Sequence, residues 1–85
     1  MTLTKLVLDV LKQLKEPTII ELAYRLLELD GIKSVDIEIK EIDVETLSLT
    51  ITIEGSNIDF EKVRGTLEKL NVVVHDINKI YVSKD

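Results

Sequence analysis

Three carboxylates stand at alternate positions in one short segment of the chain, namely Glu41, Asp43 and Glu45. In an extended backbone, side chains at alternate positions point to the same side. Carboxylate oxygens are the hard ligands that Ca²⁺ and Mg²⁺ prefer, and Ca²⁺ takes about six to eight of them. The pattern predicts a weak divalent-cation site that needs further ligands from a second protomer. A solvated acidic edge that discourages strand pairing is the alternative.

A second pair of polar residues lies in apolar surroundings. Asp9 is flanked by Val7 and Leu11, and His75, the single histidine, falls in the last apolar segment. A carboxylate in the middle of a strand is costly unless it is paired, so we expect His75 or Lys5 to pair with Asp9, or a partner subunit to satisfy it. An Asp9–His75 pair could hold a metal ion or act as a base. A structural or interface histidine is the alternative, because one imidazole and one carboxylate do not make a catalytic arrangement.

The composition excludes several classes of enzyme and partner. The chain has no cysteine, which excludes disulfides, thiolate metal sites and thiol nucleophiles. Its glycines, Gly31, Gly55 and Gly65, form no phosphate-binding loop. Seven acids and two bases between Glu28 and Glu45 account for the whole net charge of -5, and such an acidic edge repels nucleic acid. We therefore expect a protein that is not an enzyme and does not bind nucleic acid.

The length of 85 residues and the 45% hydrophobic content are those of a single small domain, residues 1–85. A chain of this size can bury roughly 60 to 65% of its unfolded surface, so a partner subunit would supplement a modest core. No apolar run approaches the roughly 20 residues of a membrane span, and the first residues lack the features of a secretory signal. We expect a cytoplasmic protein without a membrane partner.

Four segments have the residue pattern of strands. Three of them alternate apolar and polar residues with a period of two, and the fourth is rich in β-branched residues. The apolar parity of the fourth shifts around Asp76 to Asn78, which predicts a bend. The segments are residues 3–14, 35–40, 47–54 and 72–82.

Two helices are predicted between these strands. Thr18 with Glu21 matches a capping box, and the first helix is expected to run to Asp30 and stop at Gly31. Asp59 caps the second helix, which ends near Asn71. The order βαββαβ predicts an α+β fold, the ferredoxin-like plait, with an antiparallel four-stranded sheet of order 4-1-3-2 and both helices on one face.

The first helix has more apolar surface than one sheet can cover. Its apolar residues sweep roughly 220° around the axis, whereas those of the second helix occupy roughly 80°. Because Ile20, Tyr24 and Leu27 cannot all reach the same sheet, we predict that they form a subunit interface. Burial under neighbouring loops is the alternative. Val7 and Leu11 add an apolar strip on the open sheet face, which allows assemblies larger than a dimer.

Five segments, taken in order, resemble a known family. They are Leu6-Val-Leu-Asp9-Val-Leu-Lys12, Glu16-Pro17-Thr-Ile-Ile-Glu21, Leu29-Asp30-Gly31, Glu41-Ile-Asp43-Val-Glu45-Thr46 and Val74-His75-Asp-Ile77. Together they are similar to the small archaeal proteins of domain of unknown function family 211. The resemblance implies a ferredoxin-like fold, assembly into hexameric or larger rings, bound metal ions in some members and an archaeal cytoplasm. It supplies no reaction.

Two functions from different classes follow from these observations. The first is a non-enzymatic homo-oligomer, structural or divalent-cation-binding, with Ca²⁺ or Mg²⁺ as its only expected cofactor. The alternative is a small-molecule-sensing regulatory module of the amino-acid-binding type, which shares this topology and binds its ligand at the subunit interface. An acidic ion cluster would favour the first function, and a pocket between protomers would favour the second.

Overall fold

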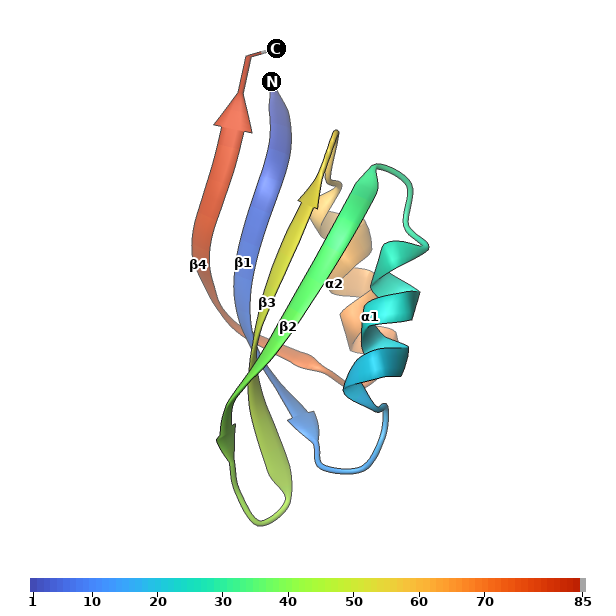
Figure 1. Cartoon of the computed structure of the whole chain (residues 1–85), viewed down its shortest axis with the longest axis vertical. Helices are drawn as coiled ribbons and strands as arrows, with labels where there is room; N and C mark the ends of the chain where they lie inside the picture. The colour runs from blue at the N-terminus through green and yellow to red at the C-terminus, as the bar shows by residue number, and fades with distance from the viewer. Residues whose placement is uncertain (85) are drawn as a thin grey trace.

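The computed structural model describes residues 1–84, which form an antiparallel sheet with two helices on one of its faces (Figure 1). The sheet order is β2-β3-β1-β4, which is the predicted order read from the other edge. The predicted ferredoxin-like α+β fold is therefore confirmed. The elements are β1 (Thr2–Gln13), α1 (Ile19–Leu27), β2 (Ile32–Ile42), β3 (Thr46–Gly55), α2 (Phe60–Lys69) and β4 (Val73–Ser83).

The core lies between the sheet and the helices. Side chains alternate between the two faces of a strand, so one set of positions on β1 and β3 is buried under the helices while the other set faces away from them. Each fully buried leucine or isoleucine contributes roughly 1.5–3 kcal/mol relative to exposure. The residues with the least exposure are Leu6, Leu8, Val10, Leu22, Leu26, Leu49, Ile51, Ile53, Val63, Leu67 and Val72.

Helix α1 begins as predicted and ends earlier. The Thr18 hydroxyl accepts a hydrogen bond from the backbone N–H of Glu21 at 3.1 Å, which caps the first turn. The helix ends at Leu27 and not at Asp30, so the predicted end was wrong. Residues 28–31 instead form turns that direct the chain into β2, and Gly31 adopts the left-handed conformation with φ of 84°.

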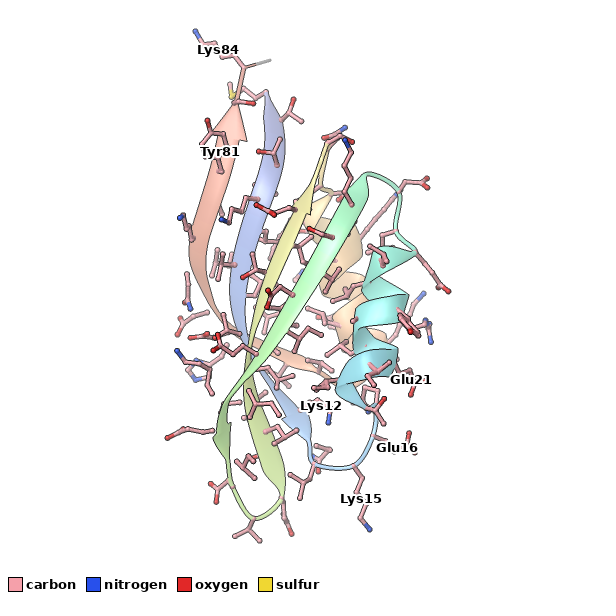
Figure 2. All side chains as sticks on the ribbon, in the orientation of Figure 1. Lys12, Lys15, Glu16, Glu21, Tyr81 and Lys84 are labelled. Carbon is pink, nitrogen blue, oxygen red and sulfur yellow. The ribbon has the colours of Figure 1, made fainter. Side chains whose placement is uncertain are left out.

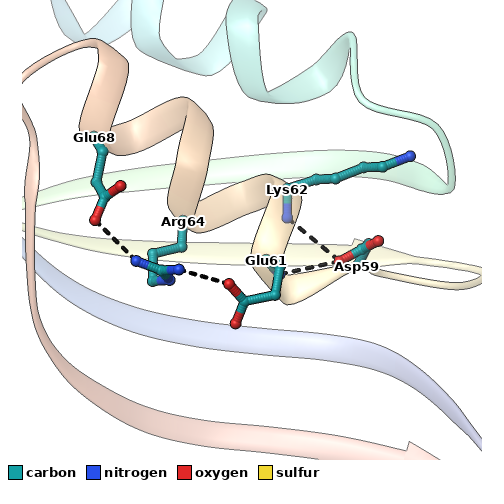
Figure 3. A network of polar contacts seen from close by, with 5 residues as sticks. All are labelled: Asp59, Glu61, Lys62, Arg64 and Glu68. Atoms are coloured by element: carbon teal, nitrogen blue, oxygen red, sulfur yellow. Dashed lines mark hydrogen bonds and ion pairs between the residues drawn. The ribbon is translucent and has the colours of Figure 1, made fainter.

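Helix α2 is fixed at both ends by local contacts. Asp59 Oδ1 accepts hydrogen bonds from the backbone N–H groups of Glu61 and Lys62 at 3.0 and 3.3 Å (Figure 3). Arg64 lies between Glu61 and Glu68 on the exposed side and forms ion pairs with both, at 2.6 and 2.9 Å (Figure 3). Such pairs each stabilise a helix by roughly 0.2–0.5 kcal/mol. Asn71, with φ of 60°, ends the helix as predicted.

Strand β4 is bent where its apolar parity shifts. The pairing of β4 with β1 skips His75 and Asn78, which have no partner on β1. Each of these two residues therefore forms a β-bulge. Asp76 stands opposite Asp9, and Ile77 stands opposite Leu8. The two bulges confirm the predicted bend and bring His75 to the sheet face that the helices leave open.

The two ends of the sheet differ in what they carry. The chain termini lie side by side at one end, where Thr2 pairs with Ser83 (Figure 1). The β2–β3 turn lies at the other end, beyond the first turn of α1 (Figure 1). Within residues 1–84, neither helix has the length and hydropathy that a membrane crossing requires.

Candidate functional site

A groove of about 470 Å³ lies on the sheet face opposite the helices. Here called the open-face groove, it contains Asp9, His75 and Glu41, which the sequence analysis singled out, and Lys40, which it did not. Residues from three separate parts of the chain thus meet because the sheet brings β1, β4 and the β2–β3 hairpin together. The other lining residues are Val10, Leu11, Ser48 and Leu49.

Asp9 is a half-buried carboxylate in this groove. Its Oδ1 accepts a hydrogen bond from the hydroxyl of Thr50 at 3.1 Å, because Thr50 is its direct neighbour on β3. The Asn78 amide, the Thr50 hydroxyl and the charges of Lys40 and His75 hold the pKa of Asp9 below its ordinary value, and partial burial opposes them. Asp9 is therefore a positioned, ionised carboxylate at neutral pH.

The partners of Asp9 are not the ones predicted. Lys5 stands opposite Glu54 on β3, and its Nζ lies 3.7 Å from that carboxylate. His75 Nδ1 lies 3.2 Å from Asp76 Oδ2, beside it on β4. Neither Lys5 nor His75 forms a hydrogen bond or ion pair with Asp9, and His75 acts on it only through its charge, because strand register decides which side chains are neighbours.

Lys40 enters the groove through a break in the β2 ladder. The register between β2 and β3 shifts between Ile39 and Glu41, so Lys40 is an extra residue there. Glu41 then stands opposite Ser48, and both line the groove. Sequence alternation places Lys40 on the polar face with Asp36 and Glu38, but it could not reveal the bulge that brings Glu41 to the same groove.

The acidic hairpin does not have the extended geometry assumed for it. Strand β2 ends at Ile42, and residues 43–45 form a turn in which the Asp43 N–H donates to the Thr46 carbonyl at 2.9 Å. Asp43 Oδ1 accepts from the Val44 N–H at 2.8 Å. The expectation that Glu41 and Asp43 share one side of an extended backbone with Glu45 was therefore wrong. Within residues 1–84, no three His, Cys, Asp or Glu side chains are arranged to hold a metal ion.

One flank of α1 is left uncovered. Leu22 and Leu26 are fully buried, whereas Ile20, Tyr24 and Leu27 are 63%, 67% and 44% exposed. These three residues, here called the α1 flank, follow one another along the helix at intervals of four and three residues and so share one face. The exposures contradict burial of this flank under neighbouring loops of the same chain.

A second apolar surface lies at the opposite edge of the sheet, on β4. Ile77 and Ile80 stand opposite the core residues Leu8 and Leu6 and so point to the helix side. They are nevertheless 53% and 56% exposed, because the helices leave this part of the edge strand uncovered. Sequence reasoning missed this surface, here called the β4 edge. The sequence signal that could have revealed it is a last strand that is rich in apolar residues although it lies at the edge of the sheet.

A buried lysine closes the end of β1. Lys12 is only 2% exposed, and its Nζ donates hydrogen bonds to the backbone carbonyls of Gln13 and Leu14. Figure 2 shows it on the helix side, near the turn into α1 that also carries Glu16. Burial lowers the pKa of Lys12, and the charge of Glu16 partly opposes this. Lys12 thus occupies a core position and also satisfies carbonyls of the turn.

The fold defines a small ferredoxin-like α+β protein, and comparison with known proteins places it in a family. The model of the family described as "Uncharacterized ArCR", domain of unknown function family 211, matches residues 4–85, and the chain belongs to this archaeal family. The uncharacterized protein MJ0319 of Methanocaldococcus jannaschii is 39% identical over 80 residues, which are 94% of this chain and 81% of that protein. The resemblance seen in the sequence is confirmed, and neither description names an activity.

Proposed function

We propose that the protein is a non-enzymatic homo-oligomer whose α1 flank packs against the β4 edge of the next subunit. The observation that carries this proposal is the exposure of both surfaces, with Tyr24 at 67% and Ile80 at 56%. Apolar patches that remain contiguous and exposed in a small protein mark interaction sites.

The positions of the two surfaces favour a ring. Helix α1 packs over β2, and β4 forms the other edge of the same sheet (Figure 1). A contact between unlike surfaces at opposite edges is head-to-tail, and it closes into a ring when the rotation between subunits permits. A ring of six or more subunits is the assembly that we propose.

The acidic charge of each subunit supports a role for divalent cations in this assembly. The excess of acids between Glu28 and Glu45 lies mostly on β2 and in the β2–β3 turn, at one edge of each subunit. Carboxylates within one hairpin repel one another, and like charges at 4 Å do so by roughly 1 to 4 kcal/mol between bulk-water and near-surface dielectric. Ca²⁺ or Mg²⁺ held by Glu41, Asp43 and Glu45 together with carboxylates of a neighbouring subunit would relieve this repulsion.

The test is a native mass spectrum of the wild-type protein with and without added Ca²⁺ or Mg²⁺. We expect one species whose mass equals that of six or more copies of the 9.7 kDa chain. When a cation is present, the mass of this species should include bound ions. A monomer at micromolar concentration would contradict the assembly. An oligomer that takes up no ion and is stabilised by a small molecule would favour the ligand-sensing alternative.

A further inference from the structure

We propose that the open-face groove binds a small zwitterion, an α-amino acid with an aliphatic side chain. This inference goes beyond the proposed assembly and does not depend on it, because one protomer supplies every residue that lines the groove. Besides Glu41, which follows Lys40 in the chain, the groove carries an anchored anion, a cation and an aliphatic surface. These are the partners of an ammonium group, a carboxylate and a hydrocarbon side chain.

The anionic anchor is Asp9. A carboxylate has about four acceptor positions, and the Thr50 hydroxyl uses one of them at 3.1 Å. Asn78 lies on the β4 side of the same carboxylate and stabilises its charge. Acceptor positions remain for an ammonium group, and the charge-assisted hydrogen bonds that it would donate are stronger than neutral ones. Because Thr50 already holds the carboxylate, little side-chain freedom is lost when a ligand binds.

The cationic partner is Lys40. Among the ion pairs of residues 1–84 none involves Lys40, so its ammonium group is available to a ligand carboxylate. Strands β1 and β2 are separated by β3, which places their backbones roughly 10 Å apart. The Lys40 side chain and a ligand whose opposite charges lie on adjacent groups together span this separation.

The lining between the two charges suits the rest of the ligand. Leu11 offers an aliphatic surface, and the Ser48 hydroxyl and His75 imidazole offer further hydrogen-bonding groups. A simple amine would leave Lys40 unpaired and would bring a second cation close to it. A simple carboxylate would be repelled by the carboxylate of Asp9. A zwitterion pairs with both charges, and we therefore favour it over an amine or a carboxylate alone.

The experiment measures binding of standard amino acids by thermal shift and then titrates L-leucine by calorimetry. Two probes remove one charge each, isoamylamine without the carboxylate and 4-methylpentanoate without the ammonium group. We expect L-leucine to bind and both probes to bind about tenfold more weakly or worse, since each loses a charge-assisted contact. No thermal shift with any amino acid would overturn the proposal, and so would equal binding of either probe.

Matched variants locate the site. Asp9→Asn and Lys40→Gln should each weaken L-leucine binding about tenfold or more, and Lys40→Gln alters an exposed side chain with little risk to folding. The controls Glu38→Gln and Lys33→Gln remove the same charges from β2 outside the groove lining and should bind as wild type does. Wild-type affinity in both groove variants would overturn the assignment. Undiminished binding in Tyr24→Glu would separate this site from assembly, whereas loss of binding there would place the ligand between subunits and refute a site within one protomer.

Discussion

At the residue scale, two charged side chains on the same strand have opposite surroundings. Asp9 faces the open side of β1 and is stabilised by polar neighbours, whereas Lys12 points to the core and is satisfied only by backbone carbonyls. The pKa of Asp9 is lowered by favourable contacts, and the pKa of Lys12 is lowered by the cost of burial. The lowered pKa of Asp9 therefore indicates a stabilising interaction of the charged form, whereas the lowered pKa of Lys12 indicates a destabilising one.

Asp9 should stabilise the fold at neutral pH and lose this effect in acid. Because the folded-state pKa lies below the usual 3.8, the ionised carboxylate favours the folded chain above that value, and its contribution is lost as the pH falls through the folded pKa. Wild type should lose more stability than Asp9→Asn as the pH falls below about 4. Urea unfolding at a series of pH values measures the difference. Parallel curves for the two proteins would contradict the contacts assigned to Asp9.

Lys12 should destabilise the fold at neutral pH and lose this effect in alkali. Its folded-state pKa lies below 10.5, so the unfolded chain binds more protons in the interval between the two values and stability rises with pH there. At neutral pH the buried ammonium group destabilises the folded chain, and this effect disappears as the lysine loses its proton above the folded-state pKa. The stability of wild type relative to Lys12→Met should therefore rise as the pH approaches 10.5. A pH-independent difference in urea unfolding would contradict this interpretation.

At the scale of elements, caps and turns begin and end the helices, and bulges bend the strands. Thr18 and Asp59 hold the first turns of α1 and α2 by side-chain acceptance of backbone N–H groups. The bulges at His75 and Lys40 lie where side chains line the open-face groove, and the bulge at Asn78 lies beside Asp9. At each of these positions a single residue starts a helix or bends a strand.

Gly65 is a site where stability can be gained. It lies inside α2, and a Cβ added there would meet no atom within 4 Å. Gly65→Ala should raise the free energy of unfolding by roughly 0.5–1 kcal/mol, because glycine loses more backbone entropy in a helix than alanine does. Gly55→Ala is the matched control and should destabilise, since its Cβ would collide with the Gly31 carbonyl oxygen. Thermal unfolding of both variants measures these effects, and a destabilised Gly65→Ala would refute the first.

The acidic hairpin should bind divalent cations only in the assembled protein. Calorimetric titration with Ca²⁺ should give heat with wild type and none with the triple variant Glu41→Gln, Asp43→Asn, Glu45→Gln. The melting temperature of the assembled wild type should rise with ion concentration by mass action. Equal or absent heats in the two proteins would show that the hairpin is only a solvated acidic edge.

At the scale of the whole molecule, the helix layer is narrower than the sheet. The two short helices leave part of the edge strand β4 uncovered, and the exposed residues there and on the outer side of α1 are apolar. A chain of this size has few ways to cover such surfaces by itself. Association of identical subunits is the simplest means of doing so.

The proposed interface can be tested with adjacent residues. Tyr24→Glu and Ile80→Glu each place an unpaired charge at the seam, which costs about 3–5 kcal/mol per contact, and should convert the oligomer to monomers in sedimentation. Tyr81→Glu is the control, because Tyr81 is 59% exposed on the opposite face of the same strand. Dissociation by Tyr81→Glu alone would move the interface to the open face.

The sequence by itself determined the elements, their order and the core. Period-two alternation identified the inward residues of β1, and caps such as Thr18 and Asp59 identified the helix starts, because these signals are local and depend on neighbours a few residues away. The same reasoning predicted too long a first helix and gave Asp9 the wrong partner. It also treated the acidic turn as an extended strand.

Only the tertiary structure decided which side chains meet. Thr50 pairs with Asp9 because of the register between β1 and β3, and Glu41 joins Lys40 in the open-face groove because a bulge resets the parity of β2. Bulges in β4 likewise decide where His75 lies. One extra residue in a ladder changes the face of everything that follows, and alternation cannot locate it where both parities are apolar. Exposure of the β4 edge likewise depends on how far the helices extend across the sheet, which no local pattern encodes.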